Sequence, residues 1–119
     1  MKSFSRTDRI SQQIKRELAD IIQRGELKDD RIGGLVTITH VEVSGDLRNV
    51  KVFFSVFGEE DQRVGTLAAL DAATGFLRGE ICRRLGIKFA PEMIFRLDDY
   101  LEKGQKITEL LDKISKNEI

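Results

Sequence analysis

The sequence predicts an α+β domain in which helices pack against one small three-stranded β-sheet. Apolar residues recur at helical spacing in some segments and alternate with polar residues, as in strands, in three others. The chain has 119 residues, of which 40% are hydrophobic, which suits one hydrophobic core rather than two. We therefore expect residues 1–119 to form a single domain with the order α-β-β-α-(kink)-α-β-α, ending in a short C-terminal helix.

The first helix is predicted from a continuous apolar stripe near the N-terminus. The stripe consists of Ile10, Ile14, Leu18, Ile21 and Ile22. Ser5 or Thr7 is the candidate N-cap, and Gly25 is the candidate end of the helix. A polar and partly basic face, expected to point outward, lies nearly opposite the stripe and consists of Arg9, Gln12, Arg16 and Gln23.

Three strands are predicted from β-branched residues and alternation. Residues 36–43 and 50–57 flank a segment with turn chemistry, which indicates an antiparallel hairpin. The second face of the 50–57 strand carries Phe53 and Phe57, so that face is not wholly polar. Pro91 precedes the third strand, in which apolar and polar residues again alternate.

One long helix, at about residues 62–85, is interrupted by glycine. Its apolar face consists of Leu67, Leu70, Leu77, Ile81 and Leu85. A glycine in a helix interior costs about 1 kcal/mol relative to alanine, so Gly75 needs a structural reason. The alternatives are a kink, close approach of a partner, or a packing accommodation. A kink is expected at Ala73, Thr74 and Gly75.

The composition argues against a membrane protein and against an enzyme. There is no apolar run of about 18 residues and no apolar signal-peptide core at the start. His40 is the only histidine and Cys82 the only cysteine, so neither a zinc site nor an internal disulfide is expected. No phosphate-binding glycine-rich loop occurs. We expect a cytoplasmic, non-catalytic protein without cofactor or metal.

The charge pattern leaves room for a nucleic-acid surface although the formal net charge is zero. Residues 1–28 hold 7 basic and 4 acidic side chains, and residues 63–91 hold 5 basic and 2 acidic side chains. Positive charge beside a glycine that permits close approach is a candidate phosphate-contacting surface. A solvated helix face is the alternative for each set. The candidate RNA-binding residues are Arg6, Arg9 and Arg16 in the first helix and Arg78, Arg83, Arg84 and Lys88 after the glycine.

Short motifs of a known family occur in order along the chain. In the N-terminal half they are RTDRI at 6–10, IKREL at 14–18, VTIT at 36–39, VEVS at 41–44, DL at 46–47 and KVFFS at 51–55. Further along they are ATG at 73–75, FLR at 76–78, and PEMIF at 91–95 with Asp98. With these motifs in order and at the right spacing, the chain resembles, from about residue 5 to residue 114, the ribosome-binding factor A family of bacterial small-subunit assembly factors.

The resemblance implies a KH-like type II fold, in which an Ala-x-Gly kink replaces the G-x-x-G loop that clamps RNA in KH domains. It also implies binding to 16S rRNA in free 30S subunits, near the neck and the decoding region. We expect the protein to be a monomer. The implied role is late assembly and 5′-end processing of precursor 16S rRNA, without catalysis and with particular importance in the cold. A ribosome-assembly GTPase is the implied functional partner for release.

The sequence departs from the family pattern at three places. Asp30 stands where many relatives have proline, so we expect a less rigid first loop. Thr74 replaces the more usual serine, which leaves the kink expectation unchanged. The chain also ends soon after its last predicted helix, so no RNA contact is expected from a long tail.

The alternative to an RNA-binding factor is a protein–protein interaction module or homodimer with the same fold. This hypothesis rests on the second apolar face of the strand that carries Phe53 and Phe57. An enzyme is disfavoured because one histidine, one cysteine and scattered carboxylates form no recognisable site.

Overall fold

The computed structural model describes residues 5–33 and 35–98. Its elements follow the predicted order as far as the third strand, which confirms the α+β fold class. They are α1 (Arg6–Gln23), β1 (Leu35–Val43), β2 (Asn49–Phe57), α2 (Glu60–Ala72), α3 (Thr74–Leu85) and β3 (Glu92–Leu97). The predicted C-terminal helix lies outside the described residues. No helix in the described part of the chain is both long and apolar enough to cross a membrane.

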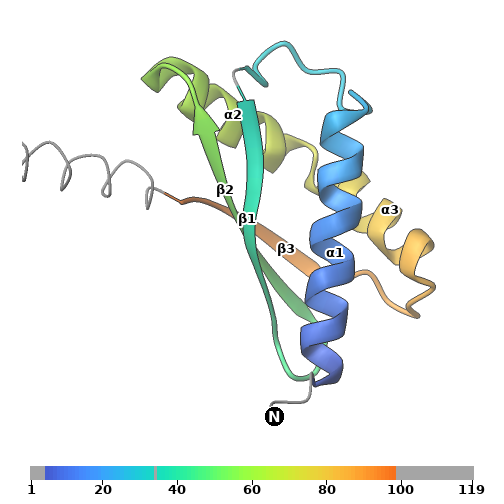
Figure 1. The fold of residues 1–119 in the computed structure, drawn as a ribbon. Coiled ribbons are helices and arrows are strands. Elements are labelled where there is room, and N and C mark those ends of the chain that lie inside the picture. The colour runs from blue at the N-terminus through green and yellow to red at the C-terminus, as the bar shows by residue number, and fades with distance from the viewer. Residues whose placement is uncertain (1–4, 34, 99–119) are drawn as a thin grey trace, which may run out of the picture.

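The three strands form one sheet in the order β1-β2-β3 (Figure 1). β1 and β2 are antiparallel, with a bulge between Ile38 and His40, while β2 and β3 are parallel. The parallel pair is possible because α2 and α3 connect the end of β2 to the start of β3 and return the chain to the end of the sheet at which β2 begins. β1 is therefore an edge strand that runs beside α1 (Figure 1).

One face of the sheet carries the hydrophobic core, and all three helices pack against it. The alternating residues of β2 that were predicted to face the core, Val50, Val52, Phe54 and Val56, are all buried. They are covered by buried residues of the helices: Ile14, Leu18 and Ile21 from α1, Leu70 from α2, and Leu77 and Ile81 from α3. The other face is open at Leu35 and Phe57, which are cross-strand partners and 69% and 83% exposed.

The expected long helix is two helices that meet at Ala73. Ala73 has φ −91° and ψ 2°, and its N–H lies 3.0 Å from the carbonyl oxygen of Ala69 and 3.1 Å from that of Leu70. The hydroxyl of Thr74 donates to the carbonyl of Asp71 at 2.8 Å. The interruption is thus present where it was predicted, but it is centred on Ala73. Gly75 lies in the first turn of α3, exposed to solvent.

Gly65 of α2 is packed more closely than Gly75. A Cβ atom at Gly65 would lie 3.2 Å from the carbonyl oxygen of Arg31, whereas a Cβ atom at Gly75 would meet nothing within 4 Å. The loop before β1 therefore lies close against α2. It is also tied locally, because the Arg31 side chain and backbone N–H hydrogen bond to Asp29 and hold the pKa of that carboxyl at about 2.

Candidate nucleic-acid interface

The first predicted basic set lies on α1 and is exposed. Ser5 caps the helix with a capping box, in which its hydroxyl accepts from the backbone N–H of Asp8 and the Asp8 carboxylate accepts from the backbone N–H of Ser5. Arg6, Arg9 and Arg16 follow, and all three are exposed. Within residues 5–33 and 35–98, none of these guanidinium groups has an ion-pair partner. Their positive charge is therefore presented to solvent.

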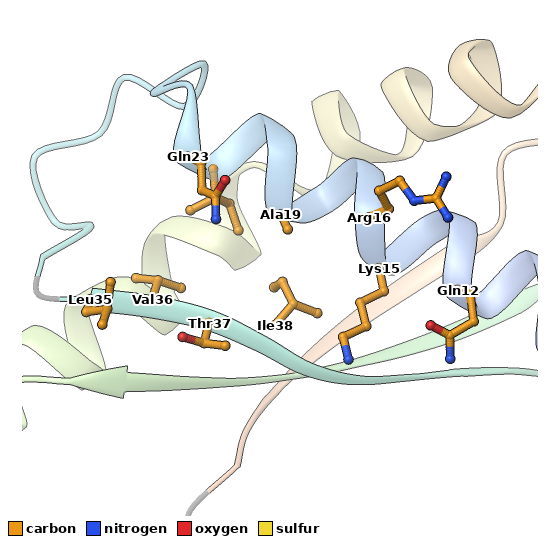
Figure 2. Close-up of a pocket in the computed structure, with 10 residues that line it drawn as sticks. Gln12, Lys15, Arg16, Ala19, Gln23, Leu35, Val36, Thr37 and Ile38 are labelled. Carbon is orange, nitrogen blue, oxygen red and sulfur yellow. The ribbon is translucent and has the colours of Figure 1, made fainter.

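Two neighbouring hollows border this set. The larger is a groove of about 340 Å³ between α1 and the first half of β1, and the smaller, of about 270 Å³, lies on α1 itself. The described residues that line the smaller hollow are Arg9, Gln12, Gln13 and Arg16. Gln12 and Arg16 also line the groove, so the two hollows are adjacent. Figure 2 shows Gln12 and Lys15 reaching from α1 toward β1, while Arg16 projects away from the strand.

The second predicted basic set is largely occupied by contacts within the protein, and Arg84 is the clearest case. Its side chain is 18% exposed and meets carboxylates from α1, α3 and the loop after α1. The guanidinium lies 2.9 Å from Glu17, 3.1 Å from Asp20, 3.0 Å from Glu26 and 3.3 Å from Glu80. Hydrogen bonding to Glu17 and Asp20 raises its pKa further above the ordinary arginine value. The structure gives this side chain a structural role that ties α3 to α1.

Arg78 is also engaged, at the turn that leads into β3. Its Nε donates to the carbonyl of Pro91 at 2.7 Å, and a terminal nitrogen donates to the carbonyl of Ala90 at 3.3 Å. The same side chain pairs with Glu92 at 3.2 Å. These contacts fix the entry to the third strand.

The two remaining members of the second set are exposed. Arg83 is 70% exposed and pairs with Glu80 at 2.7 Å. Its hydrogen bond is the largest cause that lowers the pKa of the Glu80 carboxyl, followed among the favourable contacts by that from Arg84. The ammonium group of Lys88 lies 5.5 Å from the centroid of the exposed Phe89 ring. Carboxylates therefore neutralise much of the charge around α3.

His40 and Cys82, the histidine and cysteine considered as candidate catalytic residues, make contacts that are common in folded proteins. The His40 ring lies 5.9 Å from that of Phe53 and 3.6 Å from the Glu42 carboxylate at the exposed surface. The Cys82 thiol donates to the carbonyl of Ile87 at 3.1 Å. Among the residues that the structure describes, no group of three histidine, cysteine, aspartate or glutamate side chains is placed to hold a metal ion.

Sequence reasoning missed two side chains of the α1 surface. Lys15 lines the groove, and its ammonium group donates to the carbonyl of Thr39 at 3.4 Å, next to the bulge in β1. Gln13 lines the smaller hollow beside Arg9 and Arg16. The spacing of three to four residues from Arg9 through Gln12 or Gln13 to Arg16 could have indicated this ridge, because such residues are neighbours on a helix.

Comparison with known proteins identifies similar chains. The family model described as ribosome-binding factor A matches residues 6–111. Ribosome-binding factor A of Acetivibrio thermocellus is 47% identical over 112 residues, covering 94% of this chain and 90% of that protein.

Two solved structures share the fold. The NMR structure of a Thermotoga maritima protein, a putative ribosome binding factor A, has a TM-score of 0.71 and 32% identity, and covers 81% of this chain and 90% of that one. A homology model of Thermus thermophilus ribosome binding factor A, fitted into a cryo-EM map of its 30S complex, has a TM-score of 0.60 and 33% identity. That match covers 73% of this chain and 89% of the other.

Proposed function

Because the chain belongs to the ribosome-binding factor A family, we propose that it binds free 30S ribosomal subunits through 16S rRNA and aids their late assembly. The family membership and the 30S complex of the Thermus thermophilus relative support the choice of particle. The role in 5′-end processing of precursor 16S rRNA, the importance in the cold and release by an assembly GTPase belong to the same proposal. The protein acts here by binding, and other proteins carry out the cleavage.

The observation that carries the proposal is the cationic surface of α1. Arg6, Arg9 and Arg16 are exposed and have no carboxylate partner in the described part of the chain, and the described residues that line the hollow beside them are all arginine or glutamine. Guanidinium groups bind phosphate oxygens in a two-pronged geometry, and such contacts position a protein on RNA without reading its sequence. We therefore assign the main rRNA contacts to α1.

The second basic set has a divided role in this proposal. Arg78 and Arg84 hold β3 and α1 in place, so they act on binding through the fold. Arg83 and Lys88 are exposed and remain secondary candidates for phosphate contact. The break between α2 and α3, at Ala73, Thr74 and Gly75, stays a candidate surface for close approach of RNA because Gly75 is open to solvent.

The proposal is tested by co-sedimentation of the purified protein with free 30S subunits and with complete ribosomes, at low and moderate salt. We expect binding to free 30S subunits that weakens as salt rises, since phosphate contacts release counterions. Equal binding to both particles would indicate nonspecific RNA affinity and contradict the proposal. Absence from both particles would also overturn it.

A second candidate function, a homodimer or protein–protein module, is favoured by one observation. Leu35 and Phe57 face each other across β1 and β2 on the open face of the sheet and are both largely exposed. Exposed apolar patches often mark partner surfaces. Sedimentation equilibrium distinguishes the two functions, because a dimer that forms through this face and has no affinity for 30S subunits would favour the second.

A further inference from the structure

The groove between α1 and β1 runs along the free edge of the sheet. β1 pairs only with β2 among the described strands, so its other edge has no strand partner there. The groove is bounded by Leu35, Val36, Thr37 and Ile38, which are consecutive residues (Figure 2). Since consecutive residues of a strand point to opposite faces, a hollow bounded by all four lies along the strand's edge. Backbone polar groups of β1 therefore border the groove.

Both apolar and polar side chains line the groove. Ala19 and Ile22 of α1 and Val36 and Ile38 of β1 contribute the apolar lining. Polar groups come from Gln12, Lys15, Arg16, Gln23 and Thr37. Among residues 5–33 and 35–98, no carboxylate lines the groove or the adjacent hollow on α1. Glu17 and Asp20, which also belong to α1, are held instead by Arg84.

These features match the chemistry of a single-stranded nucleic acid. An unpaired base has an apolar face and a polar edge that both donates and accepts hydrogen bonds, and glutamine amides offer both kinds of group. The phosphates on either side of the base need cations, which Arg9 and Arg16 supply at the rim. A duplex would keep its bases stacked and out of such a groove. An acidic peptide would account for the arginines but would not require Gln12 and Gln23 in the lining of the groove.

We infer that the groove between α1 and β1 binds a single-stranded segment of RNA, with one unstacked base between the helix and the strand edge and the adjoining phosphates on Arg9 and Arg16. The inference rests on the proposed function, since it names the form of RNA that the α1 surface recognises. It adds that recognition depends on the shape of the groove as well as on charge.

The test compares variants that fill the groove with variants that remove charge. Ala19→Leu adds bulk to the helical wall of the groove, and Gln12→Glu places a carboxylate in it at an exposed position. Asn49→Asp, at an exposed position of β2 outside both hollows, is the matched control for the added charge. Circular dichroism melts establish that each variant is folded before binding is measured.

Binding is measured by fluorescence anisotropy with a labelled single-stranded RNA decamer, a duplex of the same length, and a labelled decamer of glutamate. We expect the protein to prefer the single strand. Ala19→Leu and Gln12→Glu should each weaken that binding by about tenfold, the cost of losing one good base contact. The Asn49→Asp control should stay within about twofold of the unmodified protein, because its charge lies outside the groove.

The outcomes separate this inference from the proposed function. If both groove variants bind the single strand normally while Arg9→Ala/Arg16→Ala loses 30S binding, the groove inference is wrong and the proposed function stands. Tighter binding of the glutamate peptide, blocked by Ala19→Leu, would also overturn the inference in favour of an acidic protein segment. If the unmodified protein binds neither RNA nor 30S subunits, the proposed function itself fails.

Discussion

The two basic sets on α1 and α3 are similar in sequence and different in the folded protein. Each places arginines at helical spacing in a segment with net positive charge. On α1, Arg6, Arg9 and Arg16 face solvent, and the described residues offer them no carboxylate. On α3, by contrast, Arg84 meets four carboxylates and Arg78 caps the turn before β3.

The difference shows that a basic residue's role depends on what the fold brings to it. Three of the four carboxylates around Arg84 lie 58 to 67 residues away in the sequence. Packing α3 against α1 brings them together and satisfies the guanidinium. Within the part of the chain that the structure describes, no acidic side chain lines the hollow beside Arg9 and Arg16. The α1 surface thus presents its charge to solvent, while most of the charge on α3 is used in contacts within the protein.

The largest effect on binding is expected from Arg9→Ala/Arg16→Ala. Because these exposed side chains contact nothing charged in the described residues, we expect no loss of thermal stability. Binding to free 30S subunits should fall by at least about tenfold, since a hydrogen bond to a charged group contributes about 1.5–3 kcal/mol. The slope of the logarithm of the binding constant against the logarithm of the salt concentration should become less steep by about 0.7 for each lost phosphate contact with single-stranded RNA. Binding measured across a salt series checks both expectations.

The control for this prediction is Arg83→Ala/Lys88→Ala, which also removes two exposed positive charges. We expect its binding to stay within about threefold of the unmodified protein, because Glu80 already neutralises Arg83. An equal loss in the two double variants would mean that total charge, and not the α1 surface, determines binding.

The largest effect on stability is expected from Arg84→Ala. Removing this guanidinium leaves Glu17, Asp20, Glu26 and Glu80 without their shared partner, and their mutual repulsion then opposes packing of α3 on α1. The thermal midpoint should fall well below that of Arg83→Ala, and Arg84→Lys should restore part of it. Thermal melts followed by circular dichroism measure this order. A folded, fully stable Arg84→Ala that no longer binds 30S subunits would move Arg84 into the interface.

Acid should weaken the ion pairs that Glu80 forms within α3. Hydrogen bonds from Arg83 and then Arg84 lower the pKa of Glu80 below its ordinary value of 4.5. A lowered carboxyl pKa contributes stability that is present above the ordinary value and is lost as the pH falls through the lowered one. We therefore expect the thermal midpoint to fall on acidification below about pH 4.5, and to fall less in Glu80→Gln.

The comparison between Glu80→Gln and the unmodified protein cancels the contribution of Asp29. Its carboxyl, with a pKa of about 2, loses its stabilising contact with Arg31 at still lower pH in both proteins. Identical acid profiles for the two proteins would show that the ion pairs of Glu80 do not contribute to stability.

The smallest effect is expected from Gly75→Ala. A Cβ atom there meets open space and the residue lies in a helix, so alanine should leave stability unchanged or raise it by up to about 1 kcal/mol. Binding to 30S subunits should remain within about twofold if α1 carries the main contacts. Weaker binding with unchanged stability would show that RNA approaches the break between α2 and α3.

The sequence predicted which segments form helices and strands better than it predicted how the strands pair. Alternation identified the buried residues of β2, such as Val52 and Phe54, because a half-buried strand must alternate. The parallel pairing of β2 with β3 was not predictable from periodicity, since alternation says nothing of strand order. The helix break was predicted at Ala73, Thr74 and Gly75 because Gly75 interrupts the apolar pattern. In the structure the two helices meet at Ala73, whose φ of −91° does not require glycine.

The candidate site was predicted only in part. Local spacing placed Arg9 and Arg16 on a polar face of α1, and the structure leaves both exposed. The same reasoning also predicted Arg84 as an RNA-binding residue. It could not show that carboxylates occupy this side chain, because its partners on α1 are distant in the sequence. Lys15 was missed since its contact, the carbonyl of Thr39, comes from a strand that the helix meets only after folding.

The most direct test of the central claim is site-specific photocrosslinking on free 30S subunits. A photoreactive phenylalanine derivative is placed at Gln13 on α1 or at Lys88 after α3, both exposed positions, and crosslinked 16S rRNA is mapped by primer extension. We predict that position 13 crosslinks to 16S rRNA efficiently and that position 88 crosslinks weakly. Strong crosslinks from position 88 with none from position 13 would contradict the assignment of the rRNA contacts to α1.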